Sequence, residues 1–217
     1  MEQSGGRPSR EEMAKLPSGR HHLSRNYVVG NQLGRILQAV IQVVGEKGYA
    51  GLTVDTIIAA SGVSRRTFYQ LFKNKDEAFI AAYDLVASRV AGAVRESMTV
   101  EGSPVEKMNA GLAAFLEHLA AEPLAARMAI VEVLAAGPVA IERRDHAKQL
   151  FIATIADYLR RADPDWAEPE LTGEGIAGAV LEIVYSRIRR GAADTLPSLY
   201  PSLIRMFAMP RRSRAAD

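Results

Sequence analysis

Helical periodicity is the feature that most limits the folds open to this chain. Between about residues 24 and 209, apolar residues recur at the i, i+3, i+4 spacing of amphipathic helices, and no segment shows sustained strand alternation. The first clear example spans about 24–48, with apolar residues at Leu33, Ile36, Leu37, Val40, Ile41, Val43 and Val44. The sequence therefore predicts an all-α protein of about nine helices.

Capping residues and helix breakers set the expected boundaries. Thr53, Ser64 and Asn74 each precede an apolar periodic segment and can cap its first turn. Ser103 and Glu106 form a capping-box pair around Pro104, which suits the first helical position. The further helices are expected over about 54–61, 65–72, 75–98, 104–121, 123–136, 138–161, 172–190 and 197–209.

Composition excludes several classes of protein. The 217 residues are 48% apolar and 24% charged, which are ordinary globular values, so general disorder is excluded. The chain has no cysteine, which excludes disulfide scaffolds, thiolate zinc sites, iron–sulfur clusters and cysteine nucleophiles. The N-terminus lacks the apolar core of a secretory signal, and no apolar run approaches the ~20 residues of a membrane span. We expect a soluble cytoplasmic protein with no membrane association.

Catalytic and metal-binding signatures are missing from the sequence. It contains no Gly-x-Ser-x-Gly elbow and no Walker lysine, and the adjacent pair His21 and His22 does not have zinc-site spacing. Paired acids could still act in a helical bundle, but nothing selects such a pair. We therefore expect no enzyme, no metal and no cofactor.

Charge is unevenly distributed along the chain. Residues 1–75 carry 11 Lys and Arg against 5 acids, a net charge of +6, whereas residues 76–217 carry 16 bases and 20 acids, a net charge of −4. A basic first third suggests contact with a polyanion, although solvated basic tails are common.

The segment from Thr53 to Phe72 has helix-turn-helix spacing. A short helix, a break at Gly62 and a second short helix follow one another, so the second helix would read the major groove. Arg65 and Arg66 occupy its first two positions, where arginine can fork onto guanine. Cations at a helix N-terminus oppose the helix dipole, which suits an end that meets phosphate.

This region resembles the DNA-binding region of TetR-family transcriptional regulators. The resemblance covers about residues 30–85 and rests on Gly48-Tyr49, Thr53, Gly62-Val63-Ser64, Thr67-x-Tyr69-x-x-Phe72 and Lys75. The remaining chain resembles the family in helix count and order only. The resemblance implies a helical homodimer with an N-terminal DNA-binding domain and a C-terminal domain that takes a small molecule.

Site residues are carried over by position from this resemblance. Arg65, Arg66 and Tyr69 would face the groove, and Thr53 would place its helix against the DNA backbone. Phosphate contacts would come from Ser64, Thr67, Tyr69 and Lys75, and Gln70 and Lys73 complete the expected DNA-binding set. The Arg65-Arg66 pair replaces the Lys-Gly or Ala-Gly of many members, which favours G-containing sites.

An N-terminal extension precedes the helix-turn-helix. Residues 1–23 are expected to form a flexible basic arm, residues 24–75 the DNA-binding domain, and residues 76–217 the ligand-binding and dimerisation domain. Four basic residues, Arg20, His21, His22 and Arg25, could reach a minor groove, or the extension could be a tail without contacts.

Candidate effector contacts are polar or bulky residues on apolar helix faces of the C-terminal part. They are Phe115, His118, Met128, Glu132, Tyr158, Glu182 and Tyr185. For Glu132, a structural ion pair with Arg127 or Arg143 is favoured over a ligand contact, because a buried carboxylate needs a partner.

The sequence predicts a homodimer through the last two helices that binds a double-stranded DNA operator. Small residues over 175–179 would allow close helix approach there. We expect a regulator, with a repressor favoured, that is released from its operator by a small-molecule effector. The alternative is an architectural or partner-controlled DNA-binding protein without an effector.

Overall fold

The computed structural model describes residues 25–207, and all regular secondary structure in this part of the chain is helical, with no strand. The all-α prediction is confirmed. The α-helices are α1 (Arg25–Lys47), α2 (Val54–Ser61), α3 (Arg65–Leu71), α4 (Lys75–Ser97), α5 (Pro104–Ala121), α6 (Pro123–Ile130), α7 (Pro138–Ala162), α8 (Pro169–Arg189) and α9 (Tyr200–Phe207). Three 3₁₀ segments join them: η1 (Tyr49–Gly51), η2 (Glu132–Ala135) and η3 (Ala193–Leu199).

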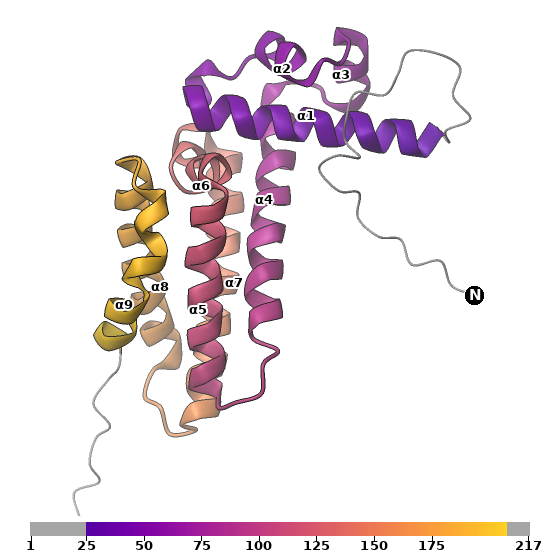
Figure 1. Ribbon diagram of the computed structural model, residues 1–217. Coiled ribbons are helices and arrows are strands. Elements are labelled where there is room, and N and C mark those ends of the chain that lie inside the picture. The colour runs from indigo at the N-terminus through magenta and orange to yellow at the C-terminus, as the bar shows by residue number, and fades with distance from the viewer. Residues whose placement is uncertain (1–24, 208–217) are drawn as a thin grey trace, which may run out of the picture.

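The helices form two layers of different orientation. Helices α1, α2 and α3 lie across one end of an elongated bundle made of α5 to α9, and α4 runs from that end down the side of the bundle (Figure 1). Helix α4 therefore belongs to both parts, since its first turn follows α3 and its last turns lie beside α5. No helix within residues 25–207 is long and apolar enough to cross a lipid bilayer.

Local capping explains most helix starts. The Thr53 hydroxyl accepts from Thr56 N at 3.1 Å, and the Thr53 N–H donates to the Thr56 hydroxyl at 2.9 Å, so α2 begins with a capping box. Ser103 and Glu106 form the expected capping box of α5. Because such contacts lie within one turn, their residues are visible in the sequence.

Three boundaries differ from the sequence prediction. The expected helix over 123–136 ends at Ile130, and the chain continues as η2 because Glu132 is drawn to a partner outside the bundle. Helix α8 begins at Pro169 and not near Thr172, whose hydroxyl accepts from Trp166 Nε1 at 3.2 Å. The last expected helix begins as η3, because Pro197 interrupts the α-helical hydrogen bonds, and α9 starts at Tyr200.

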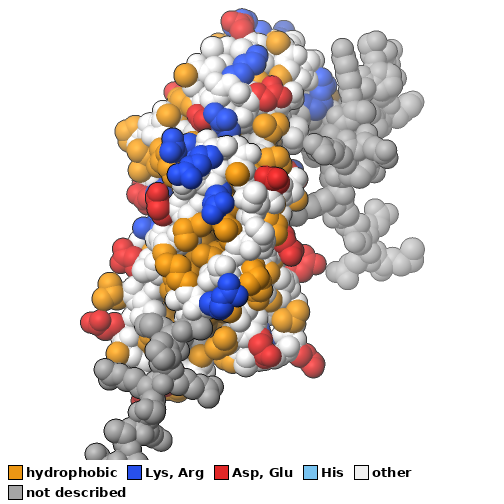
Figure 2. Space-filling model, turned by 60° about the vertical axis from the view of Figure 1, so that its left-hand side comes forward, with side chains coloured by type: hydrophobic (Ala, Val, Ile, Leu, Met, Phe, Trp, Pro, Cys, Tyr) orange, Lys and Arg blue, Asp and Glu red, His pale blue; other side chains and the backbone are white. Residues whose placement is uncertain are grey.

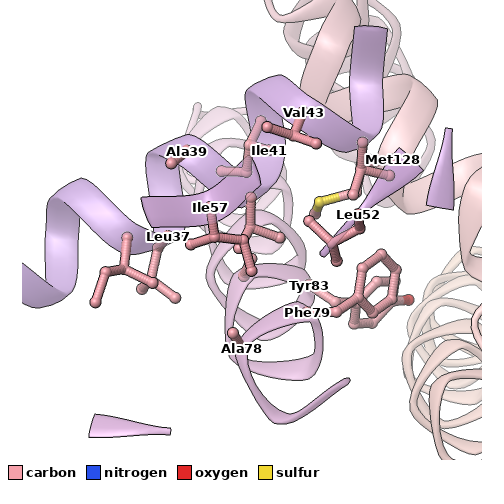
Figure 3. Close-up of a cluster of buried hydrophobic side chains, with 14 of the residues drawn as sticks. Leu37, Ala39, Ile41, Val43, Leu52, Ile57, Ala78, Phe79, Tyr83 and Met128 are labelled. Carbon is pink, nitrogen blue, oxygen red and sulfur yellow. The ribbon is translucent and has the colours of Figure 1, made fainter. Parts of the chain in front are cut away.

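One continuous core joins the two layers. Its buried side chains come from α1, α2, α3 and α4 and also from α6, η2 and α7, with Val44, Ile57, Phe68, Phe79 and Met128 among the most deeply buried. Figure 3 shows Met128 of α6 among the side chains of α1 and α4 in this cluster. A second cluster lies between α5, α6, α8, η3 and α9, and a third joins α7 to α8.

The two layers approach each other very closely at Gly45. A Cβ built on Gly45 of α1 would lie 2.6 Å from the Cβ of Leu124 and 2.8 Å from its Cα and carbonyl oxygen. These distances are too short for real atoms, and two of them involve backbone, so only glycine allows α1 to touch the first turn of α6 here.

This contact predicts opposite outcomes for two glycines of α1. Gly45→Ala should lower the free energy of unfolding by ~1–3 kcal/mol, because the methyl group overpacks the contact with Leu124. Gly30→Ala should raise it by ~0.5–1 kcal/mol, because nothing lies within 4 Å of that Cβ and alanine favours the helix. Urea unfolding followed by circular dichroism measures both; equal stabilisation by the two changes would contradict the contact.

Candidate functional site

The turn between α2 and α3 fixes one short helix against the other. Gly62 ends α2 with a left-handed backbone, φ +62°, and its N–H donates to Ile58 O. The Arg35 guanidinium of α1 donates to the carbonyl oxygen of Ser61, and a Cβ at Gly62 would lie 2.8 Å from that guanidinium. Ser64 then starts α3 by accepting from Thr67 N at 3.0 Å. The orientation of α3 is thus set by α1 as well as by the turn.

Helix α3 buries one side and exposes the other. Phe68 is fully buried, and Phe72, which follows the helix, is also in the core. The exposed residues of α3, here called the reading face, are Arg65, Arg66, Tyr69 and Gln70, and Tyr69 has 52% of its surface exposed. The exposed side of α3 therefore presents two guanidinium groups, an aromatic ring with its hydroxyl, and an amide.

The two arginines of the reading face differ in their partners. Arg65 forms an ion pair with Asp55 in the first turn of α2, which offsets the unfavourable charge at the N-terminus of α3. None of the ion pairs within residues 25–207 involves Arg66 or Lys73. Arg66 therefore keeps its full fork of donors available at the end of the helix that also presents free backbone N–H groups.

Lys75 has two intramolecular partners. Its ammonium donates to Leu52 O at 3.0 Å and lies 4.6 Å from the centroid of the Tyr49 ring. It ties the start of α4 to the residue before the cap of α2, and two further donors of the ammonium are available to an anion. Thr53, Ser64 and Lys73 are also exposed, and Thr67 is half-buried with its hydroxyl 2.9 Å from that of Ser64.

The arm residues lie largely outside the structure. Arg20, His21 and His22 fall outside the described residues, and of Arg25 only the backbone, at the start of α1, is described. The proposed arm contacts stay a prediction.

A cavity of about 1000 Å³ lies in the bundle beside α4. Its inner wall is apolar and comes from α4, α5, α6 and α7, while α8 contributes the residues from Gly178 to Tyr185. Leu134 and Leu150 also line it and are exposed, so the cavity opens to solvent. The inner apolar lining includes Val86, Val90, Val94, Phe115, Leu119, Ile130 and Phe151.

Charged side chains gather on the cavity lining as well. Arg143 of α7 lies 4.0 Å from Asp84 of α4, across the gap between these helices. Arg95 and Lys148 also line the cavity and form no ion pair within the described part of the chain. Burial raises the pKa of the Tyr83 phenol, another lining residue, to about 12, so this group stays neutral at physiological pH.

The structure brings four of the seven expected effector contacts to this cavity. Phe115, Tyr158, Glu182 and Tyr185 line it. Three do not: Met128 is fully buried in the core shared with α1, His118 lies elsewhere on α5, and Glu132 is directed away from the bundle. Arg127 Nε donates to Glu132 at 3.3 Å, so the ion pair that the sequence favours for this carboxylate is present.

Sequence reasoning missed the basic residues of the lining, Arg95, Arg143, Arg144 and Lys148. Each is an ordinary charged residue on a helix in the sequence, and only the packing of α4 against α7 reveals that they share a cavity. Within residues 25–207, no group of three or more His, Asp or Glu side chains comes together at metal-binding distance.

Comparison with known proteins agrees with these features. Residues 36–82, from α1 to α4, match the family model described as bacterial regulatory proteins, tetR family. Among curated proteins, the HTH-type transcriptional activator FasR of Mycolicibacterium smegmatis is 24% identical over 105 residues. That match spans 48% of this chain and 48% of FasR, so about half the length of the relative is covered.

Solved structures share this fold over most of the chain. The fatty acid degradation regulator FadR of Bacillus halodurans superposes with a TM-score of 0.74 at 20% identity, over 84% of this chain and 97% of that one. FadR of Bacillus subtilis in complex with stearoyl-CoA gives a TM-score of 0.72 at 17% identity, over 80% of this chain and 96% of that one. These relatives are transcriptional regulators and not enzymes. The helix-turn-helix and the family match together identify residues 36–82 as the DNA-binding region of a transcriptional regulator of the TetR type.

Proposed function

We propose that this protein is a homodimeric repressor that leaves its operator when an amphipathic anion enters the bundle cavity. The observation that carries the proposal is the position of α4, which starts beside the reading helix and forms a wall of the cavity. A ligand that moves α4 therefore has a direct mechanical route to α3. Residues 24–75 would form the DNA-binding domain, and residues 76–217 the effector and dimerisation domain.

DNA contact is assigned to the reading face and the residues beside it. Arg66, which forms no ion pair with the described residues, would donate two hydrogen bonds to guanine in the major groove. Arg65 would do the same once its ion pair with Asp55 is broken. Ser64, Thr67, Tyr69 and Gln70 lie on α3 or at its cap and would complete this contact. Thr53, Lys73 and Lys75 lie at the neighbouring helix ends and would bind phosphate.

The chemistry of the cavity selects the class of effector. Its apolar inner wall suits a long hydrocarbon group, and Arg95 and Lys148 on the lining suit a negatively charged head. The Bacillus subtilis relative is described in complex with stearoyl-CoA, a molecule of this kind. We therefore propose a long-chain acyl thioester or carboxylate as the effector.

Dimerisation is assigned to α8 and α9. Figure 2 shows hydrophobic side chains gathered on the side of the molecule where these helices lie. Nothing lies within 4 Å of a Cβ built on Gly175, so this face of α8 has room for a close neighbour, and Met206 of α9 is 63% exposed. A two-fold dimer would present two reading helices to half-sites about one helical turn apart.

Selection of binding sites from random DNA tests the DNA-binding assignment. The protein should select a two-fold symmetric site, and Arg66→Ala should cost ~1–3 kcal/mol there and relax the preference at one position of each half-site. Lys73→Ala should weaken all sequences alike and flatten the salt dependence. Arg161→Ala, at the far end of α7, serves as the control. Uniform weakening by Arg66→Ala would contradict its role in base reading.

A substitution that places a bulky side chain in the cavity tests its assignment as the effector site. Gly178 lines the cavity and has open space around its Cβ position, so Gly178→Leu should block entry of palmitoyl-CoA and leave operator binding insensitive to it. Gly92→Leu is the matched control, because Gly92 of α4 also has open space but does not line the cavity. Titration of palmitoyl-CoA by calorimetry and by operator release measures both effects, and sedimentation checks that the variants stay dimeric.

Two results of these titrations would redirect the proposal. Unchanged release from Gly178→Leu would place the effector elsewhere. No effect of palmitoyl-CoA, decanoate or palmitate on the wild-type protein would favour a DNA-binding protein without an effector. A reporter gene behind the selected operator decides the sign of regulation, which in the relative FasR is activation.

A further inference from the structure

A largely buried carboxylate, that of Glu132, connects the bundle to the helix-turn-helix. Glu132 is the first residue of η2, two positions after the last residue of α6, and its side chain is only 14% exposed. Its Oε2 accepts from the backbone N–H of Tyr49 at 3.0 Å, and its Oε1 accepts from Arg127 Nε at 3.3 Å. No neighbouring side chain caps the start of η1. The first N–H of η1, that of Tyr49, therefore donates to Glu132, which lies 83 residues away in the sequence.

The hydrogen bond between Glu132 and Tyr49 N is here called the joint between the two layers. The backbone at Gly48 leaves room for the carboxylate at this joint. Gly48 has φ +74°, which favours glycine, and a Cβ there would lie 3.0 Å from Glu132 Oε2. A larger residue at position 48 would push the carboxylate away from Tyr49 N. The glycine that ends α1 thus serves the approach of η2 as well as the turn.

Tyr49 connects Glu132 to the helices of the DNA-binding part through its side chain. Its hydroxyl donates to Asp76 in the first turn of α4, and its ring meets Phe79 edge-on with centroids 5.1 Å apart. The ring also lies under the Lys75 ammonium, which holds Leu52 O just before the Thr53 cap of α2. A displacement of Tyr49 should therefore also shift the starts of both α2 and α4.

Residues on both sides of Glu132 in the sequence line the cavity. Ala129 and Ile130 precede it and Leu134 follows it, and all three line the cavity. The segment is short and leaves the α-helical path at Val131, so a ligand pressing on Ile130 or Leu134 moves the backbone that carries the carboxylate.

We propose that Glu132 is the positioning residue through which the state of the cavity sets the position of η1 and of the reading helix. The inference rests on the proposed function, because it describes how that cavity regulates DNA binding. The Glu132–Tyr49 hydrogen bond belongs to the DNA-binding arrangement, and an occupied cavity breaks it. By linkage, the free energy that this bond gives to DNA binding opposes ligand binding by the same amount.

Removal of the carboxylate should therefore move the two affinities in opposite directions. The full-length Glu132→Ala dimer should bind the selected operator about tenfold more weakly and palmitoyl-CoA about tenfold more tightly than the wild type. The effect of palmitoyl-CoA on operator affinity should shrink by a similar factor. Glu132→Gln should give intermediate values, since its amide oxygen can still accept from Tyr49 N. Glu142→Gln, an exposed position on α7, should match the wild type.

Amide hydrogen exchange provides a readout that needs no ligand. Exchange at Tyr49 should accelerate in Glu132→Ala while the core of α4 stays protected. If Glu132→Ala does not fold, Arg127→Gln and Glu132→Gln carry the same test, because each weakens one side of the carboxylate's contacts.

Three results would overturn the role of Glu132. They are operator affinity unchanged in Glu132→Ala, a parallel loss of both affinities as in simple destabilisation, and a full ligand effect retained without the carboxylate. Failure of palmitoyl-CoA to bind the wild-type protein would instead count against the proposed effector class. In that case, operator affinity and exchange at Tyr49 still decide whether Glu132 positions the reading helix.

Discussion

The close contact between α1 and α6 is the constraint on which the rest of the structure depends. Gly45 lets the backbone of Leu124 approach so closely that α6 becomes part of the core beneath the helix-turn-helix. Met128 then fills space between α1 and α4 with no exposed surface. Because protein cores are densely packed and resist continuous deformation, the reading helix and the wall of the cavity cannot shift independently. The two layers in Figure 1 are thus one mechanical unit with a polar joint at its edge.

Features decided within one helical turn could be predicted from the sequence. The caps at Thr53, Ser64 and Ser103 are where the pattern of polar and apolar residues puts them, and α2 has the expected bounds. The expected helix over 123–136 was wrong beyond Ile130, although its residues are apolar and favour a helix. Tertiary contact overrides that local preference: Glu132 meets Tyr49 across the joint only if the chain turns out of α6 first.

The contrast between local and tertiary features also applies to the two candidate sites, the exposed side of α3 and the bundle cavity. The residues of the reading face were predicted mainly through the family resemblance, and they are exposed because α3 is short, lies on the surface and buries only the side that carries Phe68. The lining of the cavity could not be predicted, because it depends on which sides of α4, α7 and α8 leave a space between them. Periodicity identifies the apolar side of each helix but does not distinguish a packed side from one that faces a void, as Met128 and Phe115 illustrate.

A polar joint suits a regulator better than an apolar one would. Apolar contacts such as those of Met128 are non-directional and persist through small shifts, so they would carry a displacement without distinguishing two states. A hydrogen bond from a backbone N–H to a carboxylate weakens steeply as its geometry departs from linearity. Breaking it leaves a largely buried charge, which Arg127 compensates only in part because its own side chain is 43% exposed. The contact is therefore made or broken over a small movement, and the packed core on either side of it ensures that such a movement reaches α2 and α4.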